Sequence, residues 1–185
     1  MNLPKEIVEE INDHELYLRK INSDDIEFLY NSLGEENIIK YMSLGPLYSL
    51  KQAKNLLNKY LDYWENNKQF NYIIELREGQ AKNKIGVISI WNISWLHERS
   101  EIGIWMIPSH WNKGYGTRAL EMIKTISFVY IELNRLEAHI VDQNQSSNKL
   151  FSKSGFKKEG ILKEYINLRG KYYNAILYAC LKKDF

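Results

Sequence analysis

The chain has 185 residues, of which 44% are hydrophobic and 26% are charged. This composition is ordinary for a globular protein, and the length suits one domain with a buried core, so we expect a single domain over residues 1–185. The chain carries 25 Lys and Arg against 23 Asp and Glu, a formal net charge of +2. A chain so close to neutral gives no argument for binding nucleic acid or an anionic membrane.

The cysteine count and the hydrophobic runs exclude further classes of protein. Cys180 is the only cysteine, so no internal disulfide is expected, and we predict it to be a buried apolar residue. No Cys and His cluster has zinc spacing, so no metal is expected. Residues 1–13 lack an apolar signal core, and no stretch approaches the ~20 apolar residues that cross a bilayer. A cytoplasmic protein is therefore expected.

The first third of the chain predicts helices around one strand. Residues 4–11 are predicted as a short helix, and residues 15–21 alternate apolar and polar side chains as a strand does. Ser23 is predicted to cap a helix that carries two aspartates in its first turn. Ser49, followed three residues later by Gln52, forms a capping box that opens a second amphipathic helix.

From residue 70 onward the apolar period becomes that of strands. Three strands joined by short loops predict an antiparallel meander, and a polar turn segment over residues 77–84 separates the first two. The three predicted strands cover residues 70–76, 85–93 and 100–107. A long helix is predicted at 116–133. After it we expect a strand at 136–141, a helix at 147–154 and two strands around a turn at 169–170.

The loop Trp-Asn-Lys-Gly-Tyr-Gly-Thr, residues 111–117, lies between a predicted strand and the long helix. Gly114 and Gly116 permit positive φ and let backbone approach a ligand closely. The amides that follow are the unpaired donors of a helix start, so the loop predicts an anion site suited to a pyrophosphate, with Lys113 as a mobile cation. The spacing is neither a Walker A loop nor a dinucleotide fingerprint, which leaves coenzyme A as a natural candidate.

Two segments resemble a known family, the GCN5-related N-acetyltransferases. Residues 100–117 (SEIGIWMIP, then HWNKGYGT after Ser109) are similar to the family's acetyl-CoA motif, and residues 142–156 (DQNQSSNKLFSKSGF) are similar to its second motif. Glu159 and Gly160, with the closing hairpin 167–175, resemble the Rim-type ribosomal-protein N-terminal acetyltransferases and their spermidine-acetylating relatives. The resemblance covers about residues 15–183.

The resemblance implies an α/β fold, a mixed and strongly twisted sheet of about seven mostly antiparallel strands flanked by about four helices. The strand ending at Ile107 would splay from the strand beginning at Leu136, and the pantetheine arm of acetyl-CoA would lie in the gap, bonded to backbone amides like an added strand. An amide near Met106 or Ile107 would also stabilise the charge that develops on the thioester oxygen. The cofactor-binding residues implied are Met106, Ile107, Asn112, Lys113, Gly114, Tyr115, Gly116, Thr117, Asn144, Ser147, Phe151 and Lys153.

Two residues are predicted to carry the chemistry. An amine must lose a proton before it attacks a thioester, and Glu101 stands where many family members place a catalytic glutamate, so we predict it as the base. Glu159 and Glu164 are weaker alternatives, and a solvated strand carboxylate is the structural alternative. Phe151 replaces the tyrosine that often protonates the thiolate, so Ser147 is predicted as the acid, with a helix N-cap as its structural alternative.

The predicted function is transfer of the acetyl group of acetyl-CoA to a primary amine, most favourably a protein N-terminal amine. A polyamine or other small amine is the alternative acceptor, and the acids at 24–25 and 35–36 could attract it. A non-catalytic acyl-CoA sensor is the alternative from another class, which Phe151 favours. His97 and His110 are expected at the surface, His14 and His139 receive no role, and exposed edges in the last hairpin favour a homodimer.

Overall fold

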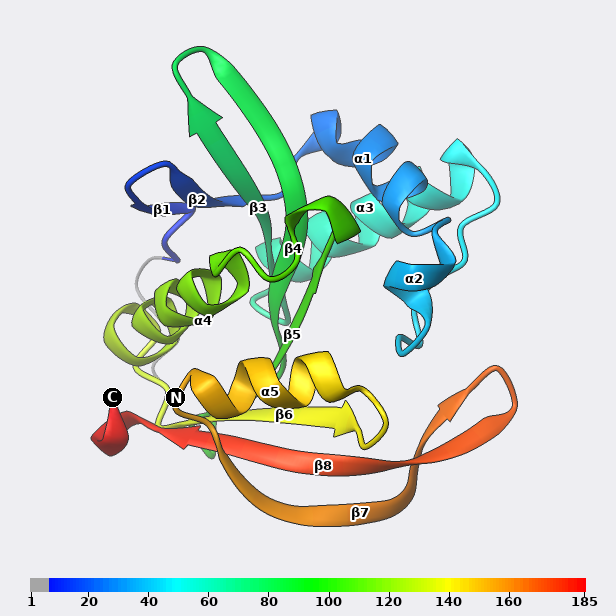
Figure 1. Ribbon diagram of the computed structural model, residues 1–185. Helices are drawn as coiled ribbons and strands as arrows, with labels where there is room; N and C mark the ends of the chain where they lie inside the picture. Colours follow the sequence, from blue (N-terminus) through cyan, green and yellow to red (C-terminus); the bar gives the residue numbers. More distant parts are fainter. Residues whose placement is uncertain (1–6) are drawn as a thin grey trace.

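The computed structural model describes residues 7–185, and within them eight strands form one mixed sheet in the order β1-β2-β3-β4-β5-β6-β8-β7 (Figure 1). The strands are β1 (Glu10–Asp13), β2 (Leu16–Lys20), β3 (Phe70–Glu78), β4 (Ala81–Ser94), β5 (Arg99–Met106), β6 (Arg135–Val141), β7 (Lys157–Leu168) and β8 (Lys171–Leu181). The helices are α1 (Ile26–Ser32), α2 (Glu36–Ile39), α3 (Leu50–Glu65), α4 (Tyr115–Thr125) and α5 (Gln145–Lys153). This confirms the predicted fold class, with one strand and one helix more than expected.

One pair of strands breaks the antiparallel pattern and positions the site. β5 and β6 run parallel and pair only from Arg99 opposite Arg135 to Glu101 opposite Glu137. Beyond Glu101 the two strands diverge, as Figure 1 shows, while every other neighbouring pair in the sheet is antiparallel. The expected splayed pair is therefore present, and its fork lies at Glu101.

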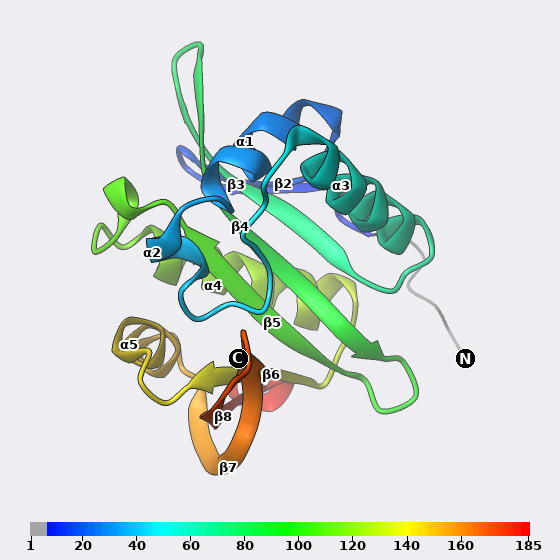
Figure 2. The same ribbon diagram turned by 90° about the vertical axis from the view of Figure 1, so that its right-hand side faces the viewer.

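Helices cover both faces of the sheet, so alternate strand residues enter two separate cores. On one face α1 and α3 pack on Ile73 and Val87; on the other α4 and α5 cover a larger core that includes Ile102 and Met106 (Figure 2). Trp105, which stacks on a ring of α1 at 5.7 Å, belongs to the first face. Because side chains alternate along a strand, Glu101 lies on the same face as Trp105.

Several predicted boundaries needed correction at the N-terminal end. The helix expected over residues 4–11 is wrong where the structure describes it, because β1 begins at Glu10 and pairs with β2; residues 4–6 lie outside the described part. Asn22, and not Ser23, caps the next turn, since its side chain accepts from the Asp24 amide. Ser49 does cap α3 as predicted, although Gln52 bonds back to the amide of Tyr48.

Tertiary pairing also changed the lengths of two elements. β3 and β4 pair as far as Glu78 and Ala81, so the predicted turn over 77–84 shrinks to Gly79 and Gln80. The long helix predicted over 116–133 is regular only to Thr125, and the following residues, Ile126–Tyr130, form a π-helical turn. The strand at β2 and the closing hairpin around Arg169 and Gly170 are confirmed.

Candidate active site

The free edge of β5 supplies backbone donors to the fork. The Ile107 amide donates to the Ile85 carbonyl at 2.9 Å, so it faces β4 and is already bonded. In an antiparallel pair the bonding direction alternates, so the amides of Ile104 and Met106 point the other way, toward β6. Of the two expected donors, the Met106 amide is therefore directed at the fork, whereas the Ile107 amide is already bonded within the sheet. The Ile104 amide, which the sequence analysis did not name, points the same way as that of Met106.

The glycine loop leads into α4 through two left-handed residues, Asn112 at φ 59° and Gly114 at φ 85°. Gly114 is the N-cap residue, and no side chain caps the helix, so the first-turn amides of Tyr115, Gly116 and Thr117 keep their donors free of a capping side chain. Such a helix start attracts anions, and the exposed loop fits a pyrophosphate.

Two other contacts fix the loop. The Trp111 indole donates to the Met106 carbonyl at 2.7 Å, which ties the loop to the end of β5. Arg118 in the first turns of α4 bonds Asp13 and Glu15 at 2.6 Å, which ties the helix to the β1–β2 turn. Lys113 is exposed, as a mobile cation should be.

Gly116 has a different reason to be glycine from the one predicted. A Cβ there would stand 3.2 Å and 3.3 Å from the two methyl carbons of Leu150, and 3.6 Å from the Met106 sulfur. The residue is therefore small because α4 and α5 pack closely at this point. Only Gly114, with positive φ and open space around it, matches the expectation of a ligand-facing glycine.

At the start of α5, the residue that caps the helix is different from the serine predicted as the acid. Asn144 caps the helix, because its Oδ1 accepts from the Ser147 amide at 3.2 Å and from the Ser146 hydroxyl at 3.0 Å. Ser147 is half-buried and is not the cap, and no hydrogen bond of its hydroxyl is found within residues 7–185. The neighbouring Asn148 holds the β6–α5 connection, its Nδ2 lying within 3.2 Å of three backbone carbonyls.

Phe151 packs into the core on the α4–α5 side of the sheet. Its side chain is buried and packs edge-on against Phe156 with ring centroids 5.0 Å apart. The cofactor contact implied by the resemblance stays a prediction. Lys153, on the same helix, is exposed.

Glu101 is not a solvated strand carboxylate. Its side chain is only 9% exposed, Oε1 accepts from Asn92 Nδ2 at 2.7 Å, and Oε2 lies 2.9 Å from His139 Nδ1. Burial acts to raise the pKa of Glu101, but the hydrogen bonds from His139 and Asn92 outweigh it and the pKa lies below its usual range. A carboxylate held ionised in this way stands at the fork, on the face that α1 and α3 cover.

The other candidate bases have structural partners or lie in the open. Glu159 is bonded through both oxygens to Arg135, which lowers its pKa. Glu164 is exposed in a bulge of β7, and His97 is exposed as predicted. His110 is half-buried beside the Ser109 hydroxyl at 3.0 Å.

The acidic residues predicted to attract a polyamine also divide into one with structural partners and three that are exposed. Asp25 is fully buried and neutralised by Arg19 and Lys84 at 2.9 Å or less, so it is wrong as a ligand for an ammonium. Asp24, Glu35 and Glu36 stay exposed.

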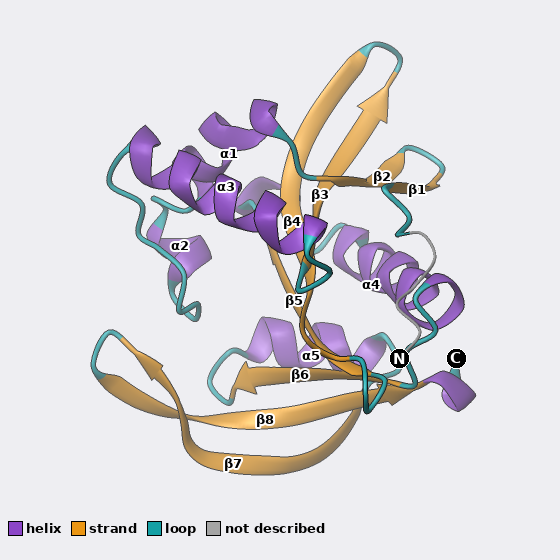
Figure 3. Cartoon of the chain, turned by 180° about the vertical axis from the view of Figure 1, so that it is seen from behind, coloured by secondary structure: helices purple, strands orange, loops and turns teal. Residues whose placement is uncertain are grey.

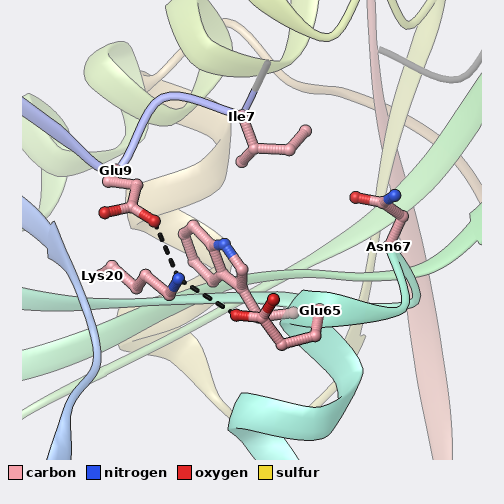
Figure 4. Close-up of a pocket in the computed structure, with 6 residues that line it drawn as sticks. Ile7, Glu9, Lys20, Glu65 and Asn67 are labelled. Atoms are coloured by element: carbon pink, nitrogen blue, oxygen red, sulfur yellow. Dashed lines mark hydrogen bonds and ion pairs between the residues drawn. The ribbon is translucent and has the colours of Figure 1, made fainter. Parts of the chain in front are cut away.

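Two surface hollows lie outside the fork. One, of about 270 Å³, holds Lys20 between the carboxylates of Glu9 and Glu65, as Figure 4 shows, and its lining comes from elements that do not form the fork. The other, of about 450 Å³, lies between the α1–α2 and α2–α3 connections. Its lining residues are Tyr30, Asn31, Gly34, Glu35, Leu47 and Tyr48. In the first hollow the charged side chains are paired with one another. In the second, Glu35 is the one carboxylate among the lining residues.

A forked sheet with an uncapped helix start on one face and a buried carboxylate on the other is suited to an acyltransferase that takes a coenzyme A thioester. Within residues 7–185 no group of three or more His, Cys, Asp or Glu side chains could hold a metal ion, and no helix there is long and apolar enough to cross a membrane.

The comparison with family models makes the class specific. Residues 15–157 match the acetyltransferase (GNAT) domain, and the chain belongs to this family. It is 29% identical to the N-acetyltransferase YoaA of Bacillus subtilis over 90% of this chain and 93% of that one. The protein is accordingly an acetyl-CoA-dependent N-acetyltransferase.

Two solved structures share the fold over nearly the whole chain. Spermidine N-acetyltransferase from Vibrio cholerae, in complex with CoA and spermine, is 25% identical with a TM-score of 0.82, over 93% of this chain and 98% of that one. Mycobacterium smegmatis RimJ, in complex with CoA-disulfide, has a TM-score of 0.84 over 92% of this chain and 83% of that one, but its 20% identity shows the fold alone.

Proposed function

We propose that this N-acetyltransferase acts on a small polyamine of the spermidine class. The observation that carries the proposal is the ionised Glu101, buried at the fork on the face that the acceptor would approach. A carboxylate there attracts an ammonium group and offers a route for its proton. The similarity to a spermidine acetyltransferase solved with spermine supports the same acceptor class.

The surroundings of the fork also suit a compact cationic acceptor. Trp91 pairs across from Glu101, and its indole nitrogen lies 3.6 Å from where a Cβ of Gly103 would stand, so aromatic surface adjoins the carboxylate. Away from the fork, the hollow at the α1–α2 connection carries Glu35 beside Tyr30 and Tyr48. Tyrosine rings and a carboxylate are the groups that hold an ammonium in water.

The last hairpin argues against a long polypeptide acceptor. Arg169 at its tip donates to the backbone carbonyls of Ile39, Lys40 and Met42 at 3.0 to 3.3 Å, and Figure 3 shows the tip reaching toward α2. A chain entering between α2 and the hairpin would have to displace these bonds. The prediction of a ribosomal-protein N-terminus, taken from the Rim-type resemblance, has weaker support, because the RimJ structure is similar in fold alone.

The residues have the following roles in the proposal. The α4 amides and Lys113 hold the pyrophosphate, and the Ile104 and Met106 amides bond the pantetheine arm or the thioester oxygen. Glu101, together with the side chains bonded to it, provides the acceptor for the proton of the amine. Ser147, freed from capping by Asn144, donates to the departing sulfur.

The experiment is an acetyl-CoA consumption assay over spermidine, spermine, short diamines and N-terminal peptides. We expect kcat/KM for spermidine or spermine to exceed that for every peptide by at least tenfold, ~1.4 kcal/mol of transition-state discrimination. A peptide acetylated as fast as the polyamines would overturn the acceptor assignment while leaving the enzyme class intact.

A further inference from the structure

His139 lies against the carboxylate of Glu101 although 38 residues separate them. The parallel pairing ends with Glu101 opposite Glu137, and two residues further along β6 the side chain returns to the same face, which brings His139 into the opening of the fork. Its imidazole is 13% exposed and is covered by the ring of Tyr165 from β7, with centroids 4.9 Å apart. The bond to Glu101 of β5 and the contact with Tyr165 of β7 thus hold this imidazole in one orientation.

The bonds around Glu101 determine which imidazole nitrogen carries the proton. Oε2 is an acceptor, and Glu101 is ionised because its pKa is depressed, so His139 Nδ1 donates to it. Nε2 is then the basic nitrogen. Within residues 7–185 Nε2 makes no hydrogen bond. The atom is not fully buried, so it keeps contact with solvent.

We propose that Nε2 of His139 takes the proton from the acceptor amine, and that Glu101 holds and balances the imidazole. This rests on the proposed amine acetylation at the fork. An imidazole nitrogen is a stronger base than a carboxylate oxygen, so Nε2 is the better proton acceptor of the two groups. The buried carboxylate stabilises the imidazolium that forms, much as it would hold any cation at that position.

The proton balance is complete with the groups at the fork. The ammonium form of the acceptor gives one proton to Nε2, directly or through a water, and the neutral nitrogen attacks the thioester carbon. The C–N bond forms and the C–S bond breaks. The second proton on that nitrogen passes to the departing sulfur by way of Ser147, and His139 returns its proton to solvent.

Other charged and polar groups lie around the imidazole and could influence its protonation. On β5 these are Glu101 and Arg99; on β6, Glu137, which lies 3.4 Å from Arg99; on β7, the Tyr165 hydroxyl. Asn92 of β4 is neutral. The carboxylate of Glu137 is paired with arginines, which leaves Glu101 as the direct partner of the ring.

The test compares His139→Gln with Glu101→Gln and with the exposed control His97→Gln, using the best primary amine found in the acceptor panel. We expect H139Q to keep its Tm and its acetyl-CoA affinity but lose at least ~10²-fold in kcat/KM. The wild type should lose activity as the pH falls, and H139Q should lack that acidic limb. E101Q should retain the limb with a smaller loss, and H97Q should resemble the wild type.

A second variant keeps the inference testable if the glutamine side chain of H139Q does not fit at this position. His139→Ala leaves space for a small base, so added imidazole should restore activity in proportion to its concentration. The inference is overturned if folded H139Q keeps near-normal turnover with an unchanged pH limb, or if imidazole fails to restore folded H139A. Because the assay uses whichever amine reacts best, loss of the polyamine assignment does not alter either outcome.

Discussion

Ser147 and Asn144 offer a test that separates chemistry from helix capping. Asn144 caps α5 through its side-chain oxygen, and Ser147 contributes its amide to that cap but not its hydroxyl. Asn144→Ala should therefore destabilise the fold by about 1 kcal/mol, the usual loss for an N-cap. For a chain of this size that corresponds to a drop in Tm of about 2–4 °C.

Ser147→Ala should behave in the opposite way. Its hydroxyl is half-buried and makes no hydrogen bond within the described part of the chain, so the Tm should change little. If the hydroxyl donates to the departing sulfur, kcat should fall by at least tenfold while the Michaelis constant for acetyl-CoA changes less, the signature of an interaction made in the transition state. Ser146→Ala, one residue earlier and exposed, is the matched control.

The assay combines thermal unfolding with steady-state kinetics on the three variants. The reasoning is refuted if S147A lowers the Tm as much as N144A while turnover stays intact, because Ser147 would then be a structural residue. It is also refuted if S146A and S147A lose turnover equally, because the loss would then come from the helix start as a whole.

Three further predictions follow from the contacts described above. Gly116→Val should destabilise the fold by about 1–3 kcal/mol in urea unfolding, because the new side chain meets Leu150; unchanged stability would show that α4 and α5 are not packed as described. Asp25→Asn should cost about 3 kcal/mol at pH 7 by leaving Arg19 without one buried partner. The depressed pKa of Asp25 adds stability only above the ordinary carboxyl pKa. The difference between variant and wild type should therefore shrink as pH falls below about 4, and an equal difference at pH 7 and pH 3 would contradict it. Arg169→Ala should raise kcat/KM for N-terminal peptides relative to spermidine, since the hairpin tip is released from α2; an unchanged ratio would mean that the tip does not limit acceptor length.

The sequence predicted the parts of this protein that local physics decides. Apolar periodicity located the strands and long helices, Ser49 marked the start of α3, and the glycine loop predicted an uncapped helix start with positive φ at Gly114. The two ordered motifs indicated the family that the comparison then showed. Each of these signals lies within a short segment, so no knowledge of distant partners was needed.

Its errors arose where a contact formed in the folded chain determines what a residue does. The N-terminal segment became a strand because β2 offered it an edge, and Asp25 lost its expected role because Arg19 and Lys84 neutralise it. The pattern of residues along the chain does not show which of these residues will come into contact when the chain folds.

The environment of Glu101 shows the division most clearly. The sequence by itself put a carboxylate on a strand next to the acetyl-CoA motif. Only the tertiary structure decided that Asn92 and His139 would bond it, because β4 and β6 are the neighbours of β5 in the sheet order. The physical reason is that strand order and register bring together residues far apart in the chain, and these long-range contacts set the ionisation of Glu101, the tautomer of His139 and hence the chemistry available at the fork.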